Sequence, residues 1–136
     1  MHLLKSLHAC LISKQYLATV YEKLAENTHD ECMQQLFRKY AEDENCHFAS
    51  IRSFYEETSG QPYVPPSTPE VPIHDFRTVL LECVSREITD IDNYKSLWQK
   101  MQAPDLRNVF YQQLQCDIRH GYGLLVLITP DDTPVK

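Results

Sequence analysis

Residues 60–72 read Gly-Gln-Pro-Tyr-Val-Pro-Pro-Ser-Thr-Pro-Glu-Val-Pro, and this stretch decides the fold. It holds five of the eight prolines of the chain, which cannot continue a helix and favour an extended path. At about 3.1 Å per residue the stretch reaches roughly 40 Å, close to the length of a helix of about 30 residues. A tight turn does not need such a length, so we expect a crossover that runs back along a long helix.

The flanks of this stretch lack the residues that break regular structure. No glycine or proline precedes Gly60, and none lies between Pro72 and Pro104. Strands joined by tight turns need such residues at short intervals, which excludes an all-β fold. Apolar residues instead recur in both flanks at three- and four-residue steps, as one face of a helix requires.

Local signals place the helix ends within each flank. Thr28 stands three residues before Glu31, the spacing of a capping box, which predicts that a second helix starts there. Ser59-Gly60 can end that helix, and Ala103-Pro104-Asp105 can open a fourth. We therefore predict an all-α four-helix bundle forming a single domain over residues 1–130, with one hairpin at about 2–59, the crossover at 60–72, a second hairpin at about 73–129 and a flexible tail at 131–136.

Composition and charge narrow the setting of the protein. The formal net charge is -6 and the basic residues are scattered, which argues against nucleic acid as a partner. No apolar run approaches the roughly 20 residues of a membrane span, and the start lacks the long apolar run of a signal peptide, so we expect a cytoplasmic protein. Five cysteines without a CxxC pair indicate neither a disulfide framework nor a thiolate zinc site. We expect no obvious apolar patch outside the bundle.

The two flanks are related by an internal duplication. A shift of 73 residues, without a gap, aligns identical residues on the inward stripes of the predicted helices, five of them between residues 10 and 47. Such a pattern is what two helical hairpins related by a pseudo-two-fold axis would show. The aligned pairs are Cys10 with Cys83, Tyr21 with Tyr94, Leu24 with Leu97, Phe37 with Phe110, and His47 with His120.

The aligned histidines belong to two carboxylate-x-x-His motifs. His47 follows Glu44 by three residues and His120 follows Asp117 by three, so each pair projects from one helix face. Glu87 lies on the predicted core stripe of the third helix. Carboxylates and imidazoles brought together in this way form the ligand set of a di-metal carboxylate site in a four-helix bundle.

With these motifs the chain resembles the ferritin-like superfamily, and is most similar to the small bacterial rubrerythrin-type di-iron proteins, over about residues 7–125. That family carries a Glu on helix one, Glu-x-x-His on helix two, a Glu on helix three and Glu-x-x-His on helix four. The duplication maps Glu87 onto Lys14, so one ligand is replaced on helix one. The metal ligands that the resemblance implies are Glu44, His47, Glu87, Asp117 and His120.

Lys14 changes the expected chemistry. Three carboxylates and an ammonium would leave two divalent ions with surplus positive charge in a poorly solvated core, so one ion is favoured over two. Either one ion is held mainly by Glu87, Asp117 and His120, with Glu44 contributing, or the Lys14 ammonium replaces the metal and pairs with the carboxylates.

The resemblance implies a metal-binding protein for iron or manganese with a degenerate dinuclear site and redox chemistry with peroxide or dioxygen. No paired CxxC module for electron supply is present, so such activity would need an external electron donor. A homodimer is the family expectation. The alternative is a non-catalytic structural or interaction bundle, a coat-like or dimeric scaffold, in which no metal binds and Lys14 neutralises the remaining acids.

Three tyrosines and one cysteine lie near the predicted ligands. Tyr21, Tyr40 and Tyr94 lie on the stripes and are expected mainly to pack the core, although the resemblance would allow them to donate hydrogen bonds to the ligands. Cys46 is next to His47, but adjacent helical residues point about 100° apart, which argues against a thiol-imidazole pair.

Overall fold

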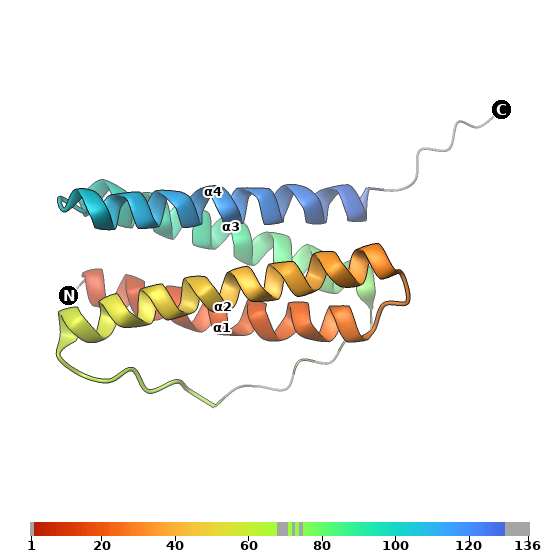
Figure 1. Cartoon of the computed structure of the whole chain (residues 1–136), viewed down its shortest axis with the longest axis horizontal. Helices are drawn as coiled ribbons and strands as arrows, with labels where there is room; N and C mark the ends of the chain where they lie inside the picture. Colours follow the sequence, from red (N-terminus) through yellow and green to blue (C-terminus); the bar gives the residue numbers. More distant parts are fainter. Residues whose placement is uncertain (1, 68–70, 72, 74, 130–136) are drawn as a thin grey trace.

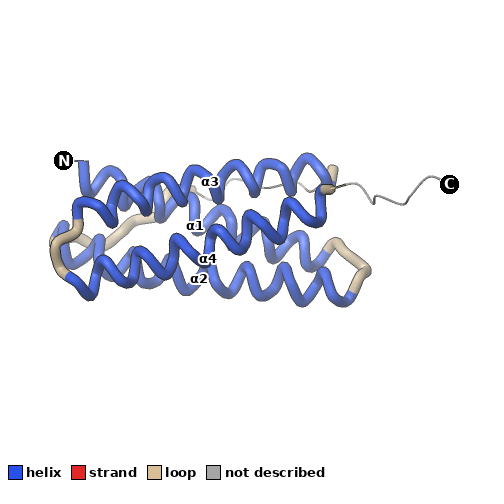
Figure 2. The backbone as a smooth tube through the Cα atoms, turned by 90° about the horizontal axis from the view of Figure 1, so that it is seen from above, coloured by secondary structure: helices blue, strands red, loops and turns tan. Residues whose placement is uncertain are grey.

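The computed structural model describes residues 2–67, 71, 73 and 75–129, and within them it contains four long helices and no strand. The helices are α1 (His2–Glu26), α2 (Glu31–Ser59), α3 (Phe76–Lys100) and α4 (Pro104–Ile128). Figure 1 shows that α2 and α3 run in the same direction, while α1 and α4 run opposite to them. The predicted all-α bundle of two helical hairpins is therefore confirmed (Figure 2).

The crossover that this arrangement requires leaves α2 at Gly60, whose φ of 69° closes the helix in the left-handed conformation. Tyr63 then buries its ring, and its amide donates to Glu56 Oε2 at 2.8 Å. Farther along, Val71 is also buried, and its carbonyl accepts from Lys23 Nζ at 3.0 Å, near the last turn of α1. The chain has thus travelled the length of the bundle, and α3 begins at the end opposite to that where α2 stops, as predicted (Figure 1).

The helix boundaries correct two expectations. Asp30, not Thr28, caps α2: the Asp30 carboxylate accepts from the amide of Met33 at 3.0 Å, and the Thr28 hydroxyl accepts from the amide of Asp30. Asp30 has the extended backbone of a cap and lies directly before the first helical residue, so its carboxylate reaches the free amides. In addition, α3 begins at Phe76 rather than at about residue 73. The expected tail at 131–136 lies outside the described residues.

The core consists of two apolar clusters. The first contains Leu17, Leu24, Phe37 and Leu80, and the second, nearer the other end of the bundle, contains Leu7, Leu11, Ile51, Leu97 and Phe110. Burial of each such side chain contributes about 1.5–3 kcal/mol. Between the two clusters, every helix contributes buried polar or charged residues. These residues form a polar layer at mid-height of the bundle.

Some large apolar side chains remain exposed on the outer surface of the bundle. Large apolar side chains on α3 and α4 are about half exposed or more, and they recur with helical spacing: Leu81, Ile88, Ile118, Tyr122 and Leu125. Ile118, Tyr122 and Leu125 lie four and three residues apart and therefore share one face of α4, while Leu81 and Ile88 lie seven apart on α3. None of the four described helices is long and apolar enough to cross a membrane.

Candidate metal centre

The polar layer receives a charged side chain from every helix. Lys14 comes from α1, Glu44 from α2, Glu87 and Asp90 from α3, and Asp117 from α4, and all five are fully buried. We call these five residues, with the Nδ1 edges of His47 and His120, the inner cluster. Buried charges are strongly unfavourable unless they are paired, so the contacts within the inner cluster decide whether the bundle tolerates it.

Lys14 lies among the carboxylates. Its Nζ donates to Asp117 Oδ2 at 2.5 Å and to Glu44 Oε2 at 2.8 Å. Asp90 Oδ2 lies 3.2 Å from the same nitrogen, and Glu87 Oε1 lies 3.9 Å away. Burial alone would lower the pKa of Lys14, but the carboxylates outweigh it and raise that pKa well above 10.5. Lys14 therefore remains an ammonium, which donates hydrogen bonds to Glu44 and Asp117 and forms an ion pair with Asp90.

The two imidazoles turn their Nδ1 atoms to the same carboxylates. His47 Nδ1 is 3.2 Å from Glu44 Oε1 and 3.5 Å from Asp117 Oδ1, while His120 Nδ1 is 3.0 Å from Glu87 Oε2. Burial disfavours a charged His120, but hydrogen bonds with Cys116 and Glu87 raise its pKa to about 11. The structure thus brings together all five residues selected from the sequence, and His120 is an imidazolium when no metal is present.

Asp90 is the buried acid that sequence reasoning missed. It accepts a hydrogen bond from Ser13 Oγ at 2.9 Å, and burial raises the pKa of its carboxyl to about 6. Ile91, the next residue along α3, is only partly buried. The spacing contained the signal, because Asp90 lies seven residues after Cys83 and four before Tyr94, both of which are fully buried. The inner cluster therefore has four carboxylates and not three.

Tyrosines support the imidazole and the acids. Tyr21 donates its hydroxyl to Glu87 Oε2 at 2.5 Å, and the Tyr40 ring stacks on His120 with a centroid distance of 4.1 Å. Gly123 permits the second contact, because a Cβ there would lie 2.0 Å from the Tyr40 hydroxyl oxygen. The Tyr94 ring lies 5.1 Å from Lys14 Nζ. Packing was the expected role, and the structure adds direct polar contact for Tyr21.

The donor set fits one iron or manganese ion. Glu44, Glu87, Asp117 and His120 each offer a ligand atom, and these atoms lie within 4.8 Å of one another. Glu87 Oε1 and Asp117 Oδ1 are buried without a hydrogen-bond partner among the described residues, although buried polar atoms are normally paired. Three carboxylates and an imidazole are donors that suit iron and manganese.

The same geometry disfavours a second ion. Lys14 Nζ already binds both oxygens of Glu44 and one oxygen of Asp117, the two carboxylates that would have to bridge two metals. With all four carboxylates ionised and His47 protonated, one divalent ion that displaces the His120 proton brings the inner cluster to neutrality. A second divalent ion would leave surplus positive charge in a buried, poorly solvated region.

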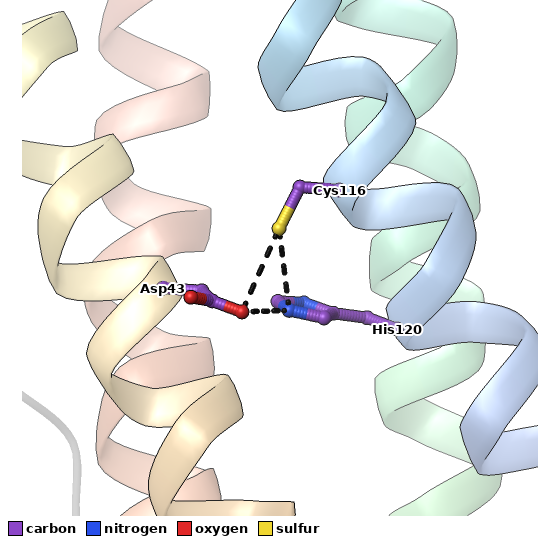
Figure 3. A group of neighbouring side chains, drawn as sticks. All are labelled: Asp43, Cys116 and His120. Carbon is purple, nitrogen blue, oxygen red and sulfur yellow. Dashed lines mark hydrogen bonds and ion pairs between the residues drawn. The ribbon is translucent and has the colours of Figure 1, made fainter.

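On its other edge, His120 meets a second group of donors, which we call the outer cluster. His120 Nε2 is 2.9 Å from Asp43 Oδ2, and Cys116 Sγ lies 3.5 Å from that nitrogen and 3.6 Å from that oxygen (Figure 3). Burial opposes a thiolate, but His120 and His47 lower the pKa of Cys116 to about 7. This group was not predicted from the sequence. Cys46, the cysteine next to His47, is exposed, and the thiol that contacts an imidazole is that of Cys116, one helical turn before His120.

A surface cavity of about 470 Å³ between α1 and α3 reaches the polar layer. Ser13 and Asp90 belong to its lining, so the cavity ends on a carboxylate that contacts Lys14. Tyr16 and Arg86 stand on its walls, with the Arg86 guanidinium 3.8 Å from the centre of the Tyr16 ring. Small solutes can therefore approach the inner cluster from this side.

Comparison with known proteins supports the fold and leaves the activity open. No protein-family model and no curated protein sequence matches the chain. A hypothetical protein from Pyrococcus furiosus is similar in structure, with a TM-score of 0.80 and 19% identity over 93% of this chain and 87% of that chain. Dps from Thermosynechococcus elongatus has a TM-score of 0.80 and 13% identity over 99% of this chain and 95% of its own. These similarities show a ferritin-like four-helix fold.

Proposed function

We propose that this chain is a ferritin-like protein that binds one divalent ion, iron or manganese, in the inner cluster, with Lys14 as a permanent cation in place of a second metal. The observation that carries the proposal is the convergence of Glu44, Glu87, Asp117 and His120 to within 4.8 Å. The ligand substitution by Lys14 in a rubrerythrin-type site is part of this proposal.

Each ligand has a distinct role. Glu87 and Asp117 supply the buried oxygens that lack other partners, and His120 supplies Nδ1 once its proton has left. Lys14 Nζ donates to both oxygens of Glu44, more closely to Oε2 (2.8 Å) than to Oε1 (3.1 Å), and an ion bound through Oε1 would take the place of the longer contact. His47 contacts Glu44 and Asp117 and would orient both carboxylates, as residues behind metal ligands commonly do.

Bound iron or manganese would supply the capacity to exchange electrons with peroxide or dioxygen. Around it, Tyr21 holds Glu87 in place, and Asp90 at the end of the α1/α3 cavity holds or releases a proton near neutral pH. An external electron donor would complete a redox cycle, since the chain carries no CxxC pairs.

Metal content after expression with iron and manganese supplied tests the proposal. We expect about one ion per chain after desalting, measured by mass spectrometry of the metal. Glu44→Gln and Asp117→Asn should each lose most of it, while Glu42→Gln, a matched change at an exposed acid on α2, should retain it. Less than about 0.1 ion per chain in the wild-type protein would overturn the metalloprotein assignment.

A second candidate function has its own supporting observation. The Lys14 ammonium already faces three carboxylates, so the bundle can be stable without metal as a structural or interaction module. This candidate predicts a melting temperature that does not change between chelator and added manganese. A rise of several degrees with manganese, together with about one bound ion, would exclude it.

A further inference from the structure

We propose that the outer cluster is a separate, zinc-type metal site formed by Asp43, Cys116 and His120. The three side chains come from α2 and α4 and direct a carboxylate oxygen, a thiol sulfur and an imidazole nitrogen to one point (Figure 3). The sequence did not indicate a thiolate zinc site, because that expectation required paired cysteines. The proposal does not depend on metal in the inner cluster.

The distances match a tetrahedral ion. With Zn–S of about 2.3 Å and Zn–N and Zn–O of about 2.0–2.2 Å, neighbouring ligand atoms in a tetrahedron lie about 3.3–3.6 Å apart. Sγ of Cys116 is 3.5 Å from His120 Nε2 and 3.6 Å from Asp43 Oδ2. The remaining pair, His120 Nε2 and Asp43 Oδ2, is 2.9 Å apart because a proton now joins them. Replacing that proton by a metal requires a separation of only a few tenths of an ångström.

Neighbouring groups already orient the ligands. His120 can donate its Nδ1 proton to Glu87 Oε2 at 3.0 Å, which leaves Nε2 as the nitrogen that can exchange its proton for a metal ion. A carboxylate behind a histidine in this way is the usual support of a zinc ligand. Lys39 holds the other oxygen of Asp43 at 2.7 Å, and the stacked Tyr40 ring fixes the plane of the imidazole. These contacts hold the Asp43 carboxylate and the His120 imidazole in place before a metal ion binds.

The chemistry of the donors separates the two clusters. A thiolate and an imidazole favour zinc over manganese, whereas the oxygen-rich inner cluster favours iron or manganese. Asp43 and Cys116 are partly exposed while His120 is buried, so the outer cluster opens toward solvent. Three protein ligands leave the fourth position of a tetrahedral ion to water or to an exchangeable ligand.

His120 links the two sites. Zinc on Nε2 keeps the ring proton on Nδ1, where it bonds Glu87, whereas an ion on Nδ1 moves that proton to Nε2, where it bonds Asp43. A neutral imidazole can serve only one of these arrangements at a time. Zinc in the outer cluster would therefore withdraw one ligand from the inner ion.

Cobalt(II) is the probe of choice, because a thiolate ligand gives it a charge-transfer absorption in the near ultraviolet that zinc then removes by displacement. We expect about one Co²⁺ per chain with this absorption in the reduced wild-type protein. Cys116→Ser should abolish the absorption. Cys46→Ser, at an exposed cysteine on α2, should leave it unchanged.

Two further variants keep the test independent of folding and of the inner cluster. Asp43→Asn should keep the absorption but bind Co²⁺ more weakly, and Glu44→Gln should keep it fully while losing manganese. Absence of the absorption from the wild-type protein, or its survival in Cys116→Ser, would overturn the outer site. Neither result would alter the manganese content by which the inner site is judged.

Discussion

Replacing Lys14 by methionine tests the arrangement of the inner cluster most directly. Methionine has a similar volume, so the change removes the ammonium and leaves the packing nearly intact. Glu44, Asp117 and Asp90 then lose the cation that lies within 3.2 Å of each of them. Removing one partner from a buried ion pair costs about 3–5 kcal/mol, because the remaining charge is uncompensated.

In the presence of a chelator we expect Lys14→Met to lower the free energy of unfolding by about 3–5 kcal/mol, which for a chain of this size lowers the melting temperature by roughly 10–15 °C. Urea and thermal denaturation followed by circular dichroism measure both quantities. Manganese should restore much of the loss, because four acids without an ammonium attract a divalent ion more strongly.

Lys95→Met is the matched control, since Lys95 lies exposed on α3 and should change stability by less than about 0.5 kcal/mol. If Lys14→Met were as stable as this control in chelator, Lys14 would not be the paired cation of the core. The single-ion proposal would then lose its basis, because it depends on Lys14 Nζ binding the two carboxylates that would otherwise bridge.

Four other changes have defined outcomes. Lys14→Glu should raise bound manganese toward two ions per chain by mass spectrometry, and no gain would mean that this position does not face the site. Burial raises the pKa of Asp90 to about 6. The stability that its protonated carboxyl contributes is therefore fully present below pH 3.8 and is lost as the pH rises through 6. Between pH 4 and pH 8, urea denaturation should show the free energy of unfolding of Asp90→Asn rising by roughly 3 kcal/mol relative to that of the wild-type protein. A difference that does not change with pH would contradict this. Gly123→Ala should lower stability by about 1–3 kcal/mol through collision with the stacked tyrosine, while Gly121→Ala, whose Cβ meets nothing within 4 Å, should gain up to about 1 kcal/mol. Sedimentation should find a homodimer that Ile118→Glu converts to monomer, because this side chain is 48% exposed in the apolar row on α3 and α4; a wild-type monomer would refute that interface.

Much of the fold could be predicted because its signals are local. Proline removes a backbone donor and fixes φ wherever it occurs, so its frequency in residues 60–72 predicted a break between helices in any tertiary context. Gly60 and Pro104 likewise mark helix ends through their own backbone preferences. The cap of α2 was wrongly assigned to Thr28, because Thr28 and Asp30 are both good caps and only the observed backbone turn places the Asp30 carboxylate over the free amides.

The site was predicted in part for a different reason. The duplication aligned His47 with His120 and so identified the two carboxylate-x-x-His pairs, but it aligned Asp90 with Leu17 and gave no hint of a fourth acid. Adjacent residues on a helix differ by about 100° in direction, so a small rotation of α3 decides whether Asp90 or Ile91 faces the core. That rotation depends on how all four helices pack.

The sequence by itself therefore determined the four helices, the crossover and the layer of acids and histidines at mid-height, because these follow from backbone preferences and helical spacing. Only the tertiary structure decided that Lys14 pairs with carboxylates from three other helices and that Asp43 meets Cys116 and His120. Those contacts join residues 30 to 103 positions apart, and their distances depend on the rotation and crossing of helices that no local pattern encodes.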